Sequence, residues 1–269
     1  DQEIKRTLRE LGVRFLAGTL DLHQELEETI ANFKKTEASV TYSSGYVTNL
    51  TTISTLIQRG DIVISDKLNH ASIVDGCRLS GAEFARFQHN DMKDLERLLK
   101  RSRSARAKIV VADAVFSMDG DIIDLPAIAA LCRKYRAWLM IDEAHSVGVL
   151  GKTGRGIEEH FGLDGVVDIK MGTLSKTIPA AGGYIAGKKD MIDYLRHASR
   201  AYIFSAALTP AQAGAANEAF KVILDEPWRV EKLCDNASRF TRGLQQVGFD
   251  TMLTETAIVP VLCGSDENA

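Results

Sequence analysis

The sequence is poor in the features that mark extracellular, membrane and nucleic-acid-binding proteins. Its 269 residues include four cysteines, none in a CxxC or metal-ligand spacing, so we expect neither disulfides nor a metal site. The net charge is only −3, and basic residues are mixed with acidic ones, which disfavours a nucleic-acid partner. No apolar run approaches the ~20 residues of a transmembrane segment, and the charged N-terminus does not resemble a signal peptide. A cytoplasmic enzyme is the default expectation.

The sequence does contain an alternation of short apolar runs with longer segments of helical period. Apolar runs such as IVVAD and WLMID suit a mostly parallel sheet that is covered on both faces, so the predicted class is α/β with three layers. The predicted strands are Ala38–Tyr42, Asp61–Ser65, Lys108–Asp113, Ala137–Asp142, Asp168–Gly172 and Gly183–Gly187. The predicted helices are Leu22–Lys34, Val47–Gln58, Met92–Arg101, Leu125–Arg136, Lys189–Ala198, Pro210–Leu224 and Arg229–Val247.

The alternation stops near residues 225–228, where a long helical segment begins. Residues 257–262 (AIVPVL) then predict one more strand, which has no following partner. We therefore expect residues 1–226 to form a large domain, with its N-terminal part incomplete. Residues 227–269 are expected to begin a smaller C-terminal α+β domain.

Two predicted strands end in residues that could carry chemistry, because functional residues of open α/β sheets gather at the carboxyl ends of strands. Asp142 closes an apolar strand, where a carboxylate is costly unless a positive group meets it. An aspartate there is also a common helix N-cap. Lys176 stands between a strand and a stretch of small residues, where its amine could be desolvated and become a nucleophile. A lone loop lysine is more often a solvated charge.

Two further loops complete a recognisable set. Ser44-Gly45-Tyr46 begins a predicted helix, whose free N–H groups and dipole suit a phosphate, although such turns are common. His70 follows another strand end, and His145 comes three residues after Asp142. Pyridoxal 5'-phosphate (PLP) needs a lysine, a carboxylate against its pyridine nitrogen, an anion cradle and a flat partner for its ring. Together the four loops predict a PLP site.

Seven stretches, in order along the chain, resemble the α-oxoamine synthases of the fold-type-I PLP-dependent enzymes. This group includes glycine C-acetyltransferase, 8-amino-7-oxononanoate synthase, 5-aminolevulinate synthase and serine palmitoyltransferase. The resemblance covers roughly residues 11 to 265. The stretches are GTLDLHQELE (18–27), SSGY (43–46), SDKLNHASIVDG (65–76), VFSMDGDIIDL (115–125), IDEAHSVGVLGKTGRG (141–156), GTLSKTIPAAGGYIAG (172–187) and YIFSAALTP (202–210).

The resemblance implies a role for each candidate residue. Lys176 would form the Schiff base with PLP, Asp142 would hold the pyridine nitrogen, and His145 would hold the phenolic oxygen. His70 would stack on the ring, and Lys176, His70 and Asp142 would be catalytic. The remaining cofactor contacts would come from Gly45, Tyr46, Ser117 and Thr173, and from Ser205 of the other subunit of a homodimer.

The implied reaction condenses a small amino acid (glycine, alanine or serine) with an acyl-CoA, usually with loss of CO2. The sequence does not distinguish among these substrates. The family's carboxylate-binding arginine would lie beyond residue 269. A Gly/Ser-rich loop that precedes the arginine matching Arg14 is absent here, where Leu11-Gly12-Val13 leads directly into it.

Two other functions compete with this interpretation. Another PLP enzyme of the same fold, such as an aminotransferase, would use Lys176 and Asp142 equally well. Residues 142–145 also spell DEAH, and Gly151-Lys152-Thr153 resembles the end of a P-loop, as in an ATPase. The P-loop needs a glycine where Ser146 stands, and the two motifs are in the wrong order. The remaining histidines, His23, His89, His160 and His197, are expected at the surface or at helix ends.

Overall fold

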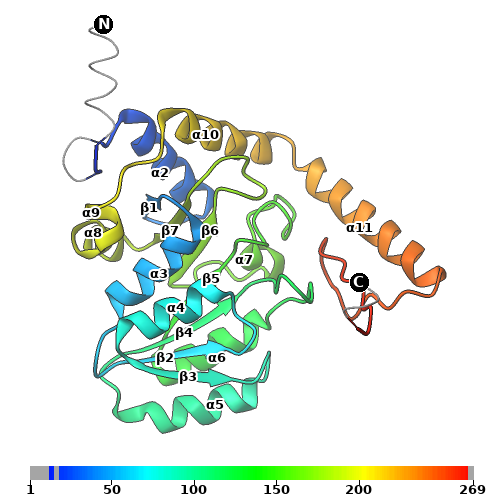
Figure 1. The fold of residues 1–269 in the computed structure, drawn as a ribbon, viewed down its shortest axis with the longest axis horizontal. Helices are drawn as coiled ribbons and strands as arrows, with labels where there is room; N and C mark the ends of the chain where they lie inside the picture. The colour runs from blue at the N-terminus through cyan, green and yellow to red at the C-terminus, as the bar shows by residue number, and fades with distance from the viewer. Residues whose placement is uncertain (1–11, 15–17, 266–269) are drawn as a thin grey trace, which may run out of the picture.

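A computed structural model describes residues 12–14 and 18–265, and a seven-stranded sheet in the order β1-β7-β6-β5-β4-β2-β3 forms its centre (Figure 1). Strand β7 is antiparallel to both of its neighbours, and every other adjacent pair is parallel. Six strands therefore end at the same edge. The strands are β1 (Ala38–Tyr42), β2 (Ile62–Asp66), β3 (Glu83–Phe87), β4 (Lys108–Asp113), β5 (Trp138–Asp142), β6 (Ile169–Thr173) and β7 (Gly183–Gly187).

Helices cover both faces of this sheet, which gives the three layers expected from the sequence. One face packs against α3 (Gly45–Leu56), α4 (Ala71–Ser80), α8 (Lys189–Ala198) and α9 (Arg200–Ile203). The other face packs against α5 (Met92–Arg101), α6 (Leu125–Tyr135) and α7 (Ile157–Phe161) beside β2, β4 and β5, and against α2 (Asp21–Phe33) and α10 (Pro210–Asp225) beside β7. A short 3-10 turn, Ser102–Ser104, follows α5.

Strand β4 shows why the central strands are apolar throughout. Successive side chains of a strand point to opposite faces of the sheet. Ile109 and Val111 accordingly join the core under α3 and α4, while Val110 and Ala112 join the core under α5 and α6. All four side chains are fully buried. The polar residues are therefore confined to the ends of the strands, at the edge of the sheet.

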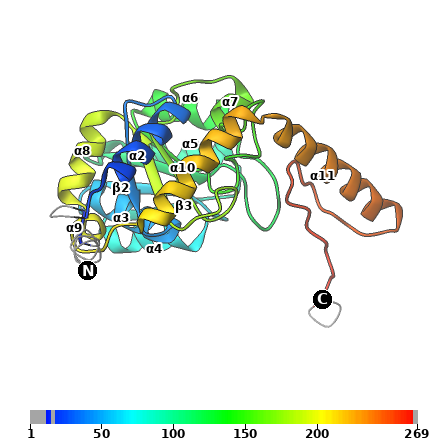
Figure 2. The ribbon, with the colours of Figure 1, turned by 90° about the horizontal axis from the view of Figure 1, so that it is seen from above.

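Helix α11 (Trp228–Gln246) extends away from this three-layer body (Figures 1 and 2). Val230 is its one buried residue, whereas Trp228 and Phe240 are half exposed or more. The chain then returns to the body, where Thr256 Oγ1 donates a hydrogen bond of 2.9 Å to the carbonyl of Gly120. In the part of the chain that the structure describes, no helix is both long enough and apolar enough to cross a membrane.

The predicted strands and helices are confirmed to within two residues, except for the strand at 257–262. That prediction was wrong, because those residues run without a strand partner and Leu262 N–H instead donates to the carbonyl of Asp250. The sequence reasoning also missed β3, α4 and the short helices α7 and α9. Strand β3 lies at the edge of the sheet, is part-exposed and is interrupted by charged residues, and α4 has His70 as its N-cap, which is an unusual residue there.

Candidate active site

The carboxyl ends of five strands surround a cavity of about 280 Å³. It lies where β1, β2, β4, β5 and β6 pass into their following loops, so residues far apart in the sequence meet there. Of the nine predicted site residues, eight line this cavity. Its lining residues are Ser44, Gly45, Tyr46, Asn49, His70, Ser72, Asp113, Val115, Ser117, Asp142, Ala144, His145, Met171, Thr173, Ser175 and Lys176.

Lys176 and His145 contact each other directly inside this cavity. The Lys176 Nζ and His145 Nε2 atoms are 2.8 Å apart. Burial lowers the pKa of His145 to about 4, and the nearby charge of Lys176 acts in the same direction. The imidazole is therefore neutral at pH 7, and its Nε2 atom can accept a hydrogen bond from the amine. Burial also lowers the pKa of Lys176, which moves this amine toward its nucleophilic form.

Asp142 lies on the floor of the cavity, at the end of β5. One carboxylate oxygen accepts a hydrogen bond from Asn49 Nδ2 at 2.6 Å, and the other accepts from the Ala144 N–H at 2.9 Å. Burial raises the pKa of Asp142, whereas these hydrogen bonds and the charge of Lys176 lower it. A cation placed against this carboxylate would stabilise its charged form.

A second buried carboxylate, Asp113, ends the neighbouring strand β4. Its Oδ2 atom accepts the backbone N–H of His70 at 3.0 Å and so fixes the loop that carries this histidine. Burial and the adjacent charge of Asp142 raise the pKa of Asp113 well above its ordinary value. Its Oδ1 atom is buried and has no hydrogen-bond partner among the residues that the structure describes. Asp113 therefore offers the cavity a buried carboxyl oxygen to which a ligand could bond.

One wall of the cavity is the first turn of helix α3. Ser44 caps this helix, because its Oγ accepts the N–H of Val47 at 3.1 Å. The N–H groups of Gly45 and Tyr46 belong to the first turn, where no earlier helical carbonyl can accept them. A Cβ atom on Gly45 would lie 2.9 Å from Thr173 Oγ1, and one on Gly183 would lie 2.8 Å from the Gly45 Cα. Glycines thus bring the helix start against β6 and β7, beside Thr173.

His70 stands at the mouth of the cavity, next to Tyr46. Their rings meet edge to face with centroids 6.4 Å apart. His70 Nδ1 lies 2.8 Å from Ser72 Oγ, and this contact fixes the ring orientation at the start of α4. His70 is also part of the cavity lining, where a flat ligand could stack on its ring.

Ser205 is the one predicted site residue that does not line this cavity. It follows α9, next to Phe204, whose side chain is 71% exposed. The sequence reasoning also missed two lining residues, Asn49 and Asp113. The signal for Asp113 was present, since it closes an apolar strand just as Asp142 does, and Asn49 lies one helical turn after Gly45.

The cavity meets the chemical requirements of PLP. It contains an amine, two buried carboxyl groups, a neutral imidazole and the start of a helix. The buried Asn49 Oδ1 and Asp113 Oδ1 atoms have no hydrogen-bond partner within the described residues, so the cavity offers polar groups to a ligand. Among the described residues, no cluster of metal-ligating side chains was found.

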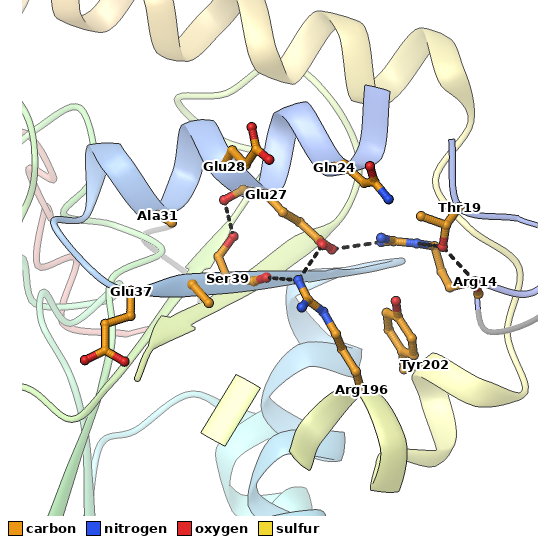
Figure 3. Close-up of a pocket in the computed structure, with 11 residues that line it drawn as sticks. Arg14, Thr19, Gln24, Glu27, Glu28, Ala31, Glu37, Ser39, Arg196 and Tyr202 are labelled. Atoms are coloured by element: carbon orange, nitrogen blue, oxygen red, sulfur yellow. Dashed lines mark hydrogen bonds and ion pairs between the residues drawn. The ribbon is translucent and has the colours of Figure 1, made fainter. Parts of the chain in front are cut away.

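A second cavity of about 410 Å³ lies beside α2 and β1 and differs in character (Figure 3). Its main charges pair with one another, because Glu27 accepts from Arg14 Nη1 at 2.9 Å and from Arg196 Nη2 at 2.9 Å. Arg196 also donates to the carbonyl of Ser39. His23, expected near the surface, is buried next to this region and bonds to the carbonyl of Leu208. We interpret this cavity as a structural junction.

Comparison with known proteins agrees with the geometry. The family model for aminotransferase class I and II matches residues 2–269. The chain belongs to this family. It is 50% identical to 8-amino-7-oxononanoate synthase 1 of Bacillus velezensis, over 98% of this chain and 69% of the relative. It is 51% identical to 8-amino-7-oxononanoate synthase of Thermosipho melanesiensis, over 93% of this chain and 64% of the relative.

Solved structures give the same result. Serine palmitoyltransferase from S. paucimobilis superposes with a TM-score of 0.91 at 37% identity, over 98% of this chain and 70% of the other. An 8-amino-7-oxononanoate synthase from Francisella tularensis gives a TM-score of 0.76 at 27% identity, over 93% of this chain and 72% of the other. Within the family, the chain therefore belongs to the α-oxoamine synthases, whose cofactor is PLP. It spans about two thirds of the length of the relatives it matches.

Proposed function

We propose that this cavity binds PLP and that the protein joins a small amino acid to an acyl-CoA, releasing CoA and CO2 and leaving an α-amino ketone. The observation that carries the proposal is the meeting of Lys176, His145 and Asp142 in one cavity, from the ends of the neighbouring strands β5 and β6. Burial lowers the pKa values of Lys176 and His145, as their roles require, and it raises the pKa of Asp142, whose charged form a cation from the cofactor would stabilise.

The residues divide the work by position. Lys176 would hold the cofactor covalently, and the start of α3 with Thr173 would hold its phosphate. Asp142, on the cavity floor, would meet the protonated ring nitrogen. His145, Ser117 and His70 would contact the phenolic oxygen, the ring edge and the ring face.

The bound cofactor supplies an electron sink for the charge left on the amino acid's α-carbon. The protein's part is proton transfer and orientation. The Lys176 amine, whose pKa burial lowers, would remove the α-proton as general base, and the neutral His145 beside it can accept or return a proton. Asp142 would keep a positive charge on the ring nitrogen, since a buried carboxylate needs a cation beside it. His70 would orient the incoming acyl group.

The chemical name of the relatives' product suggests the substrates. In 8-amino-7-oxononanoate, the amino carbon and its terminal methyl match alanine after loss of CO2, and the remaining seven carbons match a dicarboxylic acyl group. We propose alanine and a seven-carbon acyl-CoA that ends in a carboxylate. Serine with a long acyl chain is the second candidate, because the superposed serine palmitoyltransferase is also similar, at the lower identity of 37%.

We further propose that the working unit is a homodimer in which Ser205 serves the partner's site. Ser205 does not line its own chain's cavity, and the adjacent Phe204 side chain is 71% exposed. Residues 227–269 would begin the smaller domain, which fits the single buried side chain of α11. A cytoplasmic location stays a prediction.

The test measures CoA release from the PLP-loaded protein. Alanine, glycine and serine are each offered with the seven-carbon dicarboxylic acyl-CoA and with a long unbranched acyl-CoA. We expect alanine with the dicarboxylic substrate to be preferred. Serine with the long chain would move the assignment to the second candidate. If no pair releases CoA while an amino acid is converted to its keto acid, the protein is an aminotransferase and the proposed function is wrong.

A further inference from the structure

His89 is a part-buried histidine outside the cavity that lies between two carboxylates. Its Nδ1 atom is 3.1 Å from Asp66 Oδ1, and its Nε2 atom is 2.8 Å from Asp121 Oδ2. A neutral imidazole can donate from only one ring nitrogen, and its other nitrogen would then set a lone pair against a carboxylate. Both contacts are hydrogen bonds only when His89 is the doubly protonated imidazolium.

The two carboxylates belong to the two loops that carry predicted cofactor contacts. Asp66 ends β2 and its Oδ1 also accepts the N–H of Leu68, in the short loop that leads to His70. Asp121 closes the loop that contains Ser117, whose base is held by a bridge between Val115 and Ile122. His89 itself does not line the cavity. It therefore acts on the site through its neighbours.

Three further contacts reinforce the same connection. The Phe116 ring, next to Ser117, packs edge to face on the His89 ring with centroids 4.4 Å apart. The next residue, Asn90, adopts a left-handed backbone with φ of 52°. Its N–H donates to Asp66 Oδ2 at 2.9 Å and its Nδ2 donates to the Ile122 carbonyl at 3.2 Å. Residues 89 and 90 thus join the same two loops twice.

We propose that His89 is a positioning residue, which as an imidazolium holds the His70 and Ser117 loops together around PLP. Cofactor affinity should then contain a component that depends on the charge of His89. The inference rests on the proposed function, in that the cavity between these loops is taken to bind PLP. It adds a residue to that function that neither touches the cofactor nor takes part in the reaction.

The charges around His89 favour this state. Burial alone lowers the pKa of His89, but the hydrogen bonds and charges of Asp66 and Asp121 outweigh it and raise the pKa. The contribution of the His89 charge to holding the two loops together is therefore complete at low pH. It is lost as pH rises through the raised pKa of His89. Other charged side chains near this loop bond elsewhere: they are Lys67 (to Gln88), Asp94 (to Gln88 and Arg97), Asp91 (capping α5) and Glu255 (to Ile122).

The first test is the dissociation constant of PLP for the parent protein and His89→Gln at a series of pH values. Gln keeps one donor and one acceptor but carries no charge. We expect binding to weaken about tenfold near pH 6, the equivalent of one charge-assisted hydrogen bond, with the difference closing above the pKa of His89. His160→Gln, at an exposed histidine in α7, is the matched control and should bind as the parent does. If the dissociation constants of the parent and His89→Gln differ by the same factor at every pH, or do not differ at all, the proposal is overturned.

The second test is made on the parent protein and so does not depend on whether a variant at position 89 folds. Correlation of ring nitrogens with carbon-bound protons by NMR reports directly whether an imidazole carries one proton or two. We expect His89 of the parent to be doubly protonated at neutral pH, and Asp121→Asn to lower its titration midpoint. A neutral His89 at pH 7 contradicts the inference. If the parent protein does not bind PLP at all, the proposed function fails instead, and the NMR result still decides the charge state.

Discussion

Asp142 and Glu143 are adjacent in the chain and both are buried, yet they differ in what surrounds them. Glu143 forms an ion pair of 2.7 Å with Lys34, with side chains 0% and 3% exposed. It also accepts hydrogen bonds from Ile157 N–H and Ser146 Oγ. Asp142 points to the other side, into the cavity, and is bonded there to the neutral amides of Asn49 and Ala144.

The same contrast extends to a second pair of acidic residues. Behind the cavity, Glu158 pairs with the buried Lys170 at 2.7 Å. At the cavity, burial raises the pKa of Asp113 well above its ordinary value. The carboxylates behind the sheet edge therefore have their cations within the chain, and those on the cavity side have a place for a cation from a ligand. The comparison separates charge that stabilises the fold from charge that serves the site.

The largest expected effect is on the cavity side. Replacing Lys176 with Ala removes the amine that attaches PLP and takes the α-proton. We expect turnover to fall by on the order of 10³-fold or more, with little change in stability, because this lysine opens to the cavity. Borohydride reduction of the PLP-loaded parent followed by peptide mass mapping should place the label on Lys176. A label on Lys152 or Lys188 would show that the assignment is wrong.

On the ion-paired side the effect should fall on stability. Glu143→Gln leaves Lys34 buried without its partner, which we expect to cost about 3 kcal/mol in the free energy of unfolding. The Lys34→Met/Glu143→Gln double variant should recover much of this loss, since removing both charges also removes the desolvation cost. Chemical denaturation measures both. If Glu143→Gln proved as stable as the parent but lost turnover, the proposed division between the two regions would fail.

A smaller effect of opposite sign is expected for Asp113→Asn. Because burial raises the pKa of Asp113, the folded protein binds an extra proton, and stability falls as pH rises from 3.8 through the raised value. Asn keeps an acceptor for the His70 N–H and lacks this penalty. Without PLP, the variant should be about 1 kcal/mol more stable than the parent at neutral pH. The advantage should vanish below pH 3.8. Thermal unfolding measured at a series of pH values tests this, and a variant that is less stable than the parent at every pH would contradict it.

The sequence predicted the parts of the fold that depend on local pattern. Strand β4 has an unbroken apolar run over residues 109–112, and the helix from Pro210 has a Thr209 N-cap with a capping box, so their positions follow from the chain itself. Strand β3 could not be found this way, because Glu83–Phe87 has charged residues at two of its five positions and no long apolar run, and it pairs only with β2 at the edge of the sheet.

The candidate site was predictable where a residue type is itself unusual for its position. Lys176, Asp142 and the Ser44–Tyr46 turn belong to this class, and the structure brings them together. Asn49 and His89 were missed, because their significance depends on partners distant in the sequence. His89 was expected to be a surface or helix-end residue. It lies instead between Asp66 and Asp121, which are 55 positions apart in the sequence. Only the folded chain defines such a residue.

The central claim is that Asp142 keeps its charge for the cofactor's ring nitrogen rather than for the fold. Asp142→Asn preserves the shape of the side chain and removes that charge. The measurement is exchange of the α-proton of bound alanine in deuterated solvent, with PLP content and thermal stability followed in parallel. We predict retained PLP, unimpaired stability and exchange slowed by roughly 10²-fold or more, about 3 kcal/mol in the barrier. Exchange at the parent rate, with a stability loss of about 1 kcal/mol as for a lost helix cap, would contradict the account.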